Sequence, residues 1–287
     1  MNAPLQLLVT CLGVALVGCV SRAASAPPQA AAAPTPTPTP TPSPTPSPTA
    51  FTWPNGASAA VSLTYDDAIP SQLDNAAPAL ARHGLLATFF LTGTSATLKA
   101  APERFRALVE AGHELGSHTM THPCDRALDF VRPGMALQDF DQARMDRELE
   151  DSVKQLRELG QTGPLTFAYP CGSTWLGEAR TSYVPSIERS FSAARGVEPS
   201  LADPRSTPLF EVPSVMGDRD AATLTSWVER ALSSHGWLVF TFHGVAGDHL
   251  AVSESAHEAL LGYLEQHKQS IWTERFGTVA SYVAAHR

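Results

Sequence analysis

Three short segments, far apart in the chain, carry the residue types that hydrolytic metal sites use. They are TYDDA at 64–68, HTMTH at 118–122 and TFHG at 241–244. In the first segment, the adjacent carboxylates of Asp66 and Asp67 can divide two tasks, since one can bind a cation while the other accepts a proton. The residue types of the three segments together imply hydrolysis.

The histidines of the other two segments supply the remaining chemistry. His118 and His122 are four residues apart, so we expect them to share one face of a helical turn, where two imidazoles can bind one metal ion. His243 is then left to act as an acid.

The elements that must position these residues alternate between strand and helix. Runs rich in β-branched and aromatic residues predict strands over 59–67, 87–93, 113–119, 165–170 and 237–243. Amphipathic segments with end signals predict helices over 71–84, 102–112, 140–160 and 220–236. Ser71 is the expected N-cap of the first helix. This alternation implies a parallel sheet, open or closed into a barrel, with the three segments at the carboxyl ends of strands, where catalytic residues belong.

Length and charge narrow the domain organisation and the partners. Residues 51–287 have the length of one domain, because α/β barrels of this size form a single core. The net charge of −8 and the pI of about 5.6 argue against a nucleic-acid partner. A neutral or cationic glycan is easier to accommodate.

The chain begins with a predicted export signal. Residues 5–18, LQLLVTCLGVALVG, form an apolar run that is long enough for a signal-peptide core but too short for a membrane span. The run ends in LVGC, which resembles the lipobox of bacterial lipoproteins. We therefore expect residues 1–18 to be a signal peptide and Cys19 to carry a lipid, giving an exported cell-envelope lipoprotein, periplasmic or attached to the outer membrane. Cleavage after Ala26 would instead release a secreted protein.

Residues 19–50 form a predicted tether. From Pro27 to Ala50 the composition is almost wholly Ala, Pro, Thr and Ser, with the repeat TPTPTPTPSPTPSPT at 35–49. Proline holds such a chain near polyproline II, and nothing apolar is available for burial. We therefore expect a disordered, semi-rigid linker between the lipid anchor and the domain.

Cys124 and Cys171 are the two thiols that remain after processing at Cys19. Both belong to segments that we expect beside the metal site. In an oxidising compartment a disulfide between them would close a loop of 47 residues and stabilise the domain by about 4 kcal/mol. Two unpaired small residues are the alternative.

On these motifs, residues 59–286 resemble the polysaccharide deacetylases of carbohydrate esterase family four, also called the NodB-homology fold. The family's first motif, TFDDG, is matched by TYDDA, with Ala68 in place of Gly, and its second, H-[ST]-x-x-H, is matched in full by HTMTH. The resemblance implies a distorted (β/α) barrel in a single domain. It also implies a hydrolase that removes acetyl groups from a polysaccharide, with N-acetyl groups of a chitin-like polymer or peptidoglycan as the expected substrate.

Carried over residue by residue, the resemblance gives roles to five side chains. Asp67, His118 and His122 correspond to the metal ligands, and zinc is the expected divalent ion. Asp66 corresponds to the general base that deprotonates a metal-bound water. His243 corresponds to the general acid that protonates the leaving amine.

The third motif departs from the family. Its Arg-x-Pro-Tyr pattern is replaced by FAYPCG at 167–172, so the Arg that orients the base is missing. Arg195 is the candidate substitute, with a structural salt bridge as the alternative. The backbone N–H near Cys171 is the expected oxyanion donor. Tyr169 in the same segment and Trp175 are candidate substrate contacts.

The motifs do not assign the carboxylate that commonly tunes the acid histidine. Asp218, Asp220 and Asp248 are candidates, and a solvated loop position is the alternative for each. His249 follows His243 by six residues and is a candidate substrate contact.

Two other functions stay open. O-deacetylation of xylan or a similar plant polysaccharide would use the same metal ion and base. A glycan-binding module with the same fold would have lost its base or a metal ligand, whereas all five motif residues are present in this chain.

Overall fold

The computed structural model describes residues 51–287. The predicted signal peptide over 1–18, the lipid-bearing Cys19 and the linker over 19–50 lie outside the described residues and stay predictions. Within the described part of the chain, no helix is both long and apolar enough to cross a membrane.

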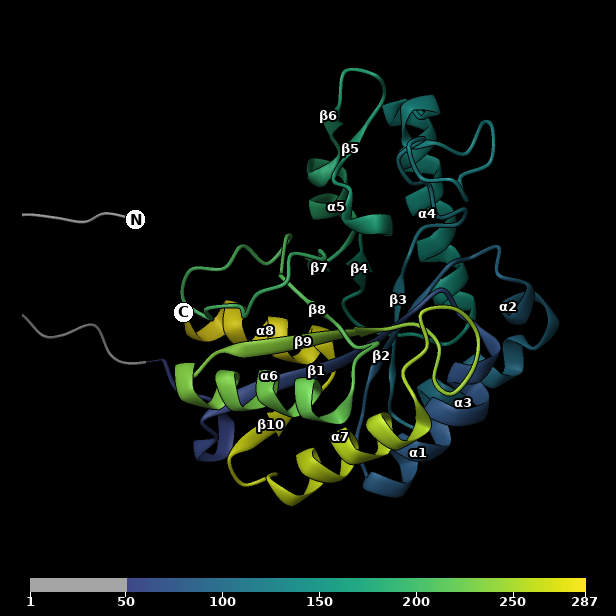
Figure 1. The fold of residues 1–287 in the computed structure, drawn as a ribbon. Helices are drawn as coiled ribbons and strands as arrows, with labels where there is room; N and C mark the ends of the chain where they lie inside the picture. Colours follow the sequence, from purple (N-terminus) through teal and green to yellow (C-terminus); the bar gives the residue numbers. More distant parts are fainter. Residues whose placement is uncertain (1–50) are drawn as a thin grey trace, which may run out of the picture. The chain divides into compact units, whose positions relative to one another are not determined.

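A parallel sheet forms the centre of the domain (Figure 1). Its strands are β1 (Ala59–Asp66), β2 (Thr88–Leu91), β3 (Glu114–Ser117), β4 (Thr166–Ala168), β7 (Ala193–Arg195), β8 (Val215–Met216), β9 (Trp237–Phe242) and β10 (Ile271–Thr273). Neighbouring strands follow the order β7-β4-β3-β2-β1-β9-β8, and β10 pairs with β1. All the ladders of this sheet are parallel. The five predicted strands are therefore present, together with the shorter β7, β8 and β10, which no sequence signal predicted.

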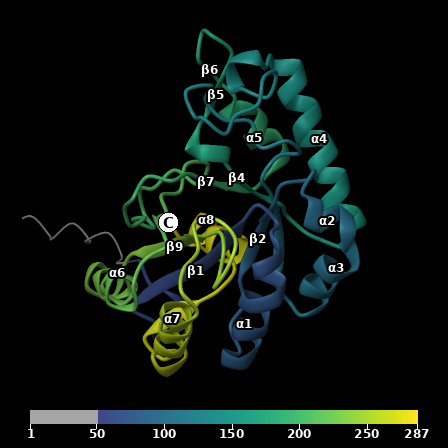
Figure 2. The same ribbon diagram turned by 45° about the vertical axis from the view of Figure 1, so that its right-hand side comes forward.

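Helices cover the sheet (Figure 2). They are α1 (Ala77–His83), α2 (Ala96–Ala100), α3 (Pro102–Glu110), α4 (Gln142–Glu158), α5 (Val184–Ser190), α6 (Ala221–Ser234), α7 (Glu254–Gln266) and α8 (Phe276–His286). Apolar residues of α1, α3, α4, α6 and α7 share one core with the sheet, which we call the outer core. Residues of α8 belong to a second, inner core. A hairpin of β5 (Trp175–Leu176) and β6 (Thr181–Ser182) lies outside the main sheet.

Strand β1 shows how the two cores leave room for a polar site. Leu63 and Tyr65 pack in the outer core, whereas Ala60 packs in the inner core. Because side chains alternate along a strand, Thr64 and Asp66 face the same side as Ala60. Both are buried. The alternation therefore delivers polar groups to the inner side near the carboxyl end of the strand.

The sheet curls until its edge strands approach each other. The backbone of Arg195 on edge strand β7 bridges to Val212, which shortly precedes edge strand β8. The described residues all fall within one compact unit. This arrangement confirms the distorted (β/α) barrel and the single domain.

The structure corrects the start of the first predicted helix. Ser71 directly precedes a π-helical segment (Gln72–Ala76) that continues into α1, but its φ of −64° and ψ of −19° are already helical, and its side chain makes no capping hydrogen bond. Its N–H donates instead to Asp248 Oδ2 at 2.8 Å, and its hydroxyl accepts from Val245 N–H at 3.1 Å. Tertiary hydrogen bonds to the loop after β9 thus replace the local cap. Gly84 ends the helix as predicted, with a φ of 62°.

Glu114 is a buried carboxylate at the amino end of β3. It accepts hydrogen bonds from the Thr166 hydroxyl at 2.6 Å, the Thr88 hydroxyl at 2.8 Å and the Gly277 N–H at 2.9 Å. Burial raises the pKa of Glu114 above its ordinary value, although these hydrogen bonds act in the opposite direction. The group therefore couples stability to pH.

We expect Glu114→Ala to lower the free energy of unfolding by about 3 kcal/mol, because three buried donors lose their acceptor. Glu114→Gln should cost less, since the amide can still serve them. The pKa of Glu114 is higher in the folded chain, so its stabilisation is present below the unfolded pKa of about 4.3 and is lost as pH rises through the folded pKa.

Chemical denaturation at several pH values between about 4 and 8 tests this linkage. The Gln variant should lack this component of the pH dependence. Glu110→Gln, which changes an exposed carboxylate on α3, should retain it. Equal unfolding midpoints for the Ala and Gln variants would contradict the bonding of Glu114.

Candidate metal centre

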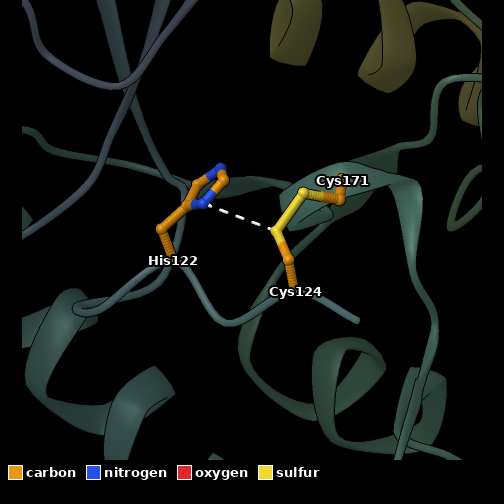
Figure 3. A group of neighbouring side chains, drawn as sticks. All are labelled: His122, Cys124 and Cys171. Atoms are coloured by element: carbon orange, nitrogen blue, oxygen red, sulfur yellow. Dashed lines mark hydrogen bonds between the residues drawn. A yellow bond between two sulfur atoms is a disulfide. The ribbon is translucent and has the colours of Figure 1, made fainter. Parts of the chain in front are cut away.

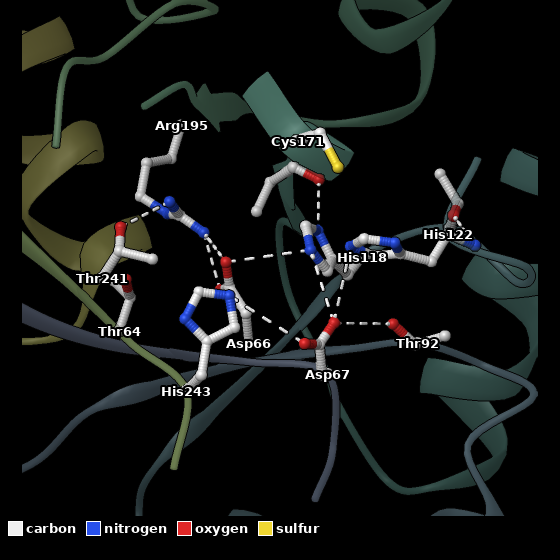
Figure 4. A network of polar contacts seen from close by, with 12 residues as sticks. Thr64, Asp66, Asp67, Thr92, His118, His122, Cys171, Arg195, Thr241 and His243 are labelled. Carbon is white, nitrogen blue, oxygen red and sulfur yellow. Dashed lines mark hydrogen bonds and ion pairs between the residues drawn. The ribbon is translucent and has the colours of Figure 1, made fainter. Parts of the chain in front are cut away.

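Asp66 and Asp67 lie at the carboxyl end of β1, with both carboxylates in one polar cluster (Figure 4). Consecutive strand residues normally point to opposite faces of the sheet. Asp67 escapes this alternation because its φ of 83° places it in the left-handed region just after the strand. Ala68, at the position of the family's glycine, also has a positive φ, of 56°. The backbone turn therefore brings two adjacent carboxylates to one site.

Arg195 holds Asp66. Its Nη2 donates to both carboxylate oxygens, at 2.6 Å to Oδ1 and 2.5 Å to Oδ2. Its Nη1 donates to the Thr241 hydroxyl at 2.6 Å and to the Ser214 hydroxyl at 3.2 Å. Arg195 is fully buried and comes from β7, which pairs with the strand of the third motif. The candidate substitute for the missing arginine thus contacts the carboxylate that it was expected to orient.

His118 and His122 do not share a helical turn, so that prediction is wrong. The segment between them is an irregular loop with positive φ at Thr119 and His122, 62° and 54°. The Thr119 hydroxyl accepts from the His122 N–H at 3.0 Å and stabilises the turn. Side-chain and tertiary hydrogen bonds override the i, i+4 pattern, yet the two imidazoles still face each other, with ring centroids 4.7 Å apart.

Glu148 on α4 fixes this loop from outside. Its Oε2 accepts from the N–H groups of Met120 and Thr121, at 2.9 and 2.8 Å, and its Oε1 accepts from the Thr121 hydroxyl at 2.9 Å. Sequence reasoning missed Glu148, because nothing distinguishes it locally from the other charged residues of an amphipathic helix. Its role depends on contacts with Thr121 and Met120, which precede it in the sequence by 27 and 28 residues.

The ring nitrogens of His118 and His122 converge on one oxygen of Asp67. Asp67 Oδ1 lies 3.8 Å from His118 Nε2 and 3.5 Å from His122 Nε2. One ligand atom from each residue falls within 4.8 Å of the others. A tetrahedral ion with ligands at about 2.1 Å separates them by about 3.4 Å. The spacing and the donor types therefore fit a divalent cation.

In both histidines, the ring nitrogen that does not face Asp67 has a contact of its own. His118 Nδ1 donates to Ala168 O at 2.8 Å, and burial lowers the pKa of His118 to about 4. His122 Nδ1 lies 3.5 Å from Cys124 Sγ, a sulfur that has no proton in a disulfide, so the imidazole is the donor. In each ring, Nε2 is thus the nitrogen that faces Asp67 and would bind a metal ion.

A disulfide joins Cys124 to Cys171, with Sγ atoms 2.04 Å apart, directly beside His122 (Figure 3). It ties the loop of the second motif to the third segment. Cys171 itself has a positive φ of 52°. The turn whose backbone N–H was expected to meet an oxyanion is thus anchored next to a candidate metal ligand.

Two other predicted residues behave differently. The prediction that Tyr169 contacts substrate is wrong. Its side chain packs in the outer core, where the centroids of the Tyr169 and Tyr183 rings are 5.6 Å apart, so it cannot contact substrate. Strand alternation is the reason, since Ala168 takes the inner side instead. Trp175 lies on the β5–β6 hairpin, where the Arg180 guanidinium sits 4.3 Å above its ring. No hydrogen bond or ion pair within residues 51–287 joins Trp175 to the five motif residues.

His243 lies on the side of Asp67 opposite His118 and His122, with its Nε2 3.9 Å from Asp67 Oδ2 (Figure 4). Its Nδ1 is buried and has no hydrogen-bond partner among the described residues. Burial lowers the pKa of His243, while Asp66 and Asp67 act to raise it.

None of the three candidate carboxylates makes a hydrogen bond or ion pair with His243 among the described residues. Asp220 caps α6 through the Thr223 N–H, and Asp248 accepts from Ser71. Asp218 Oδ1 is buried without a hydrogen-bond partner in the described chain, although Arg219 Nη1 lies 3.2 Å away. Met216 pairs with Thr241 between β8 and β9. Asp218 and His243 each follow their residue of this pair by two positions along the chain.

His249 contributes more directly than expected. Its Nε2 donates to Asp67 Oδ2 at 2.8 Å. Burial alone would raise the pKa of Asp67, but this hydrogen bond and the neighbouring imidazoles lower it well below its usual range. The sequence had offered only the short distance from His243 as a signal.

Comparison with known proteins supports the motif assignment. The sequence model of the polysaccharide deacetylase family matches residues 48–183. A chitooligosaccharide deacetylase of Sinorhizobium fredii is 42% identical over 79 residues, which cover 25% of this chain and 34% of that protein. A gellan lyase of a Bacillus species is 31% identical over 121 residues, which cover 42% of this chain and 4% of that protein. The chain thus spans about a third or less of these relatives.

Solved structures share the fold. A probable polysaccharide deacetylase of Pseudomonas aeruginosa has a TM-score of 0.60 at 16% identity, covering 82% of this chain and 94% of that one. A family 4 carbohydrate esterase of Streptomyces lividans has a TM-score of 0.50 at 19% identity, covering 75% and 91%. Motifs, fold and family match agree: the domain that begins near residue 51 is a polysaccharide deacetylase domain of the NodB-homology type, in carbohydrate esterase family four.

Proposed function

We propose that the domain is a zinc-dependent hydrolase that removes N-acetyl groups from an amino-sugar polymer, chitin-like or peptidoglycan. The observation that carries the proposal is the convergence of Asp67, His118 and His122 beside Asp66, a second carboxylate held by Arg195. His118 Nε2 lies 3.8 Å from an oxygen of each carboxylate, but Asp67 also faces His122 whereas Asp66 is bound by Arg195. This is the division of labour that metal-assisted hydrolysis needs.

Asp66 serves as the general base. A bound divalent ion would polarise the acetyl carbonyl and lower the pKa of water. Asp66 accepts the proton of the attacking water, and the two hydrogen bonds from Arg195 fix the orientation of its carboxylate. The backbone N–H of Cys171 donates to the oxyanion that develops on the carbonyl oxygen.

His243 serves as the general acid. An amide nitrogen is a poor leaving group until it is protonated, and a buried imidazolium with a lowered pKa is a strong proton donor. His243 faces Asp67 from the side opposite His118 and His122 (Figure 4). Asp218, whose buried Oδ1 also lacks a hydrogen-bond partner in the described chain, is the candidate to position this imidazole, although no hydrogen bond joins it to Nδ1.

The choice of an N-acetyl substrate draws support from the chitooligosaccharide deacetylase that the chain resembles over 79 residues. An O-acetyl esterase acting on xylan would use the same side chains. A glycan-binding module would keep the fold without turnover. Substrate assays separate the three.

We expect the purified full-length protein to release acetate from chitooligosaccharides or peptidoglycan. A chelator should stop the release, and added Zn²⁺ should restore it, because the ligand set binds the ion reversibly. Acetate from acetylated xylan alone would make the protein an O-esterase. Binding without acetate release from any of these substrates would make it a glycan-binding module.

Two variants separate the base from the ligands in the same assay. Asp66→Asn should keep bound zinc and lose activity by about 10³-fold, whereas His118→Ala should lose both. His286→Gln, an exposed histidine at the end of α8, is the matched control and should change neither. Full activity of Asp66→Asn would show that another group is the base.

We expect His243→Gln to discriminate between leaving groups. Turnover of an N-acetyl substrate should fall by about 10²- to 10³-fold, because the amine cannot leave without a proton, whereas an activated acetyl ester should lose at most about tenfold. The measurement is kcat on both substrates with zinc content checked. Equal losses on both would remove His243 from the role of acid.

A further inference from the structure

The carboxylate of Asp67 is shared between two pairs of imidazoles. Its Oδ1 faces His118 and His122, at 3.8 and 3.5 Å. Its Oδ2 faces His243 and His249, at 3.9 and 2.8 Å. Figure 4 shows Asp67 between His243 on one side and the first pair on the other. A carboxylate that has a pair of imidazole nitrogens beside each of its oxygens has the geometry to bridge two metal ions.

The second pair forms a compact set of donors with Asp67. One ligand atom from each of Asp67, His243 and His249 lies within 4.8 Å of the others, and the two rings have centroids 5.5 Å apart. Two imidazoles and one carboxylate are a donor set that suits zinc and other first-row divalent ions. Ions bridged by a carboxylate commonly stand about 3.5 to 4 Å apart.

The backbone fixes the position of His249. The loop folds back on the end of β9, where Gly244 N–H donates to His249 O at 3.1 Å. A Cβ at position 244 would lie 2.0 Å from Gly247 O, so only glycine fits there. Ser71 N–H also donates to Asp248 at 2.8 Å and holds the loop against the first helix. The contact between His249 and Asp67 is therefore built into the loop.

No arginine or lysine side chain occupies the Oδ2 side of Asp67 in the described chain. The buried Arg195 pairs with Asp66 and not with Asp67. Within the described chain, the groups that contact the Asp67 carboxylate are imidazoles and the Thr92 hydroxyl. Arg195 is close enough for its charge to act on His243, but the ion pair with Asp66 offsets that charge, and no arginine or lysine of the described chain contacts Oδ2 itself.

We propose that Asp67, His243 and His249 form a second divalent-cation site, with Asp67 bridging it to the first. The inference rests on the proposed use of Asp67, His118 and His122 as the first site. The second site is the weaker one, because the His249 side chain is 54% exposed whereas that of His118 is 2% exposed. On binding, the ion takes the Nε2 lone pair of His249, and the proton that His249 shared with Asp67 leaves to solvent.

Occupancy of the second site inhibits the proposed reaction. A metal ion on His243 occupies the nitrogen that must carry a proton to the leaving group. Zinc in excess of one equivalent should therefore lower turnover, in contrast to the first equivalent, which activates.

Equilibrium dialysis of the full-length protein against Zn²⁺, with metal counted by mass spectrometry, tests the site without an activity readout. The wild type should bind two ions per chain, the second at least about 100-fold more weakly than the first. His249→Gln should bind one, with the first affinity unchanged. His286→Gln, the exposed control, should bind two.

The outcomes separate this inference from the function on which it rests. One ion in the wild type, or two in His249→Gln, would overturn the second site and leave the deacetylase proposal standing. No ion in the wild type would overturn both. As a second readout, activity in excess zinc relative to activity at one equivalent should fall in the wild type and stay level in His249→Gln. The same fall in both proteins would also contradict the proposal.

Discussion

The buried ion pair between Arg195 and Asp66 is the interaction on which the rest of the site depends. An uncompensated charge in a protein interior costs roughly 3 to 5 kcal/mol when its partner is removed, so each group requires the other. Arg195 also donates to Thr241 and Ser214. The pair thereby connects β1, β7 and β9 with the residue before β8. It lies where the two edge strands of the curled sheet approach each other.

The ion pair with Arg195 distinguishes the surroundings of the two carboxylates. Both oxygens of Asp66 accept from Arg195, so Asp66 is oriented but is already paired with a cation. Asp67 has no such partner and faces only imidazoles and one hydroxyl in the described chain. Two adjacent residues of the same type thus have different surroundings, which suit Asp66 to the proposed role of base and Asp67 to that of ligand. The same absence of an arginine on Asp67 leaves its second oxygen open to His243 and His249.

Much of this arrangement follows from local patterns. The β-rich run that ends at Asp66 predicts β1, and the strand–helix alternation predicts that Asp66, His118 and His243 meet at one edge of the sheet. The motif also predicts that His118 and His122 lie beside Asp67, and residue type and order are enough for that. These carboxylates and imidazoles can be recognised in the sequence without knowing any tertiary contact.

What the patterns could not give depends on contacts between distant residues. The spacing of His118 and His122 predicts a helical turn, but Glu148 accepts the loop's N–H groups and a different backbone results. Serine is a residue type that favours N-caps, but Ser71 makes hydrogen bonds to Asp248 and Val245 instead. The position of Tyr169 in the third segment predicts a substrate contact, but strand alternation places its side chain in the outer core. In each case a hydrogen bond or a side-chain direction set by the fold overrode a local preference.

The division of labour between the two aspartates is the central claim, and a zinc-edge anomalous difference map from crystals of the protein grown with one equivalent of Zn²⁺ tests it most directly. The assignment predicts one dominant peak at about 2.1 Å from an Asp67 oxygen and from Nε2 of His118 and His122. Asp66 should remain paired with Arg195 and outside the ligand shell. A peak bound by Asp66, with Arg195 displaced, would contradict the assignment.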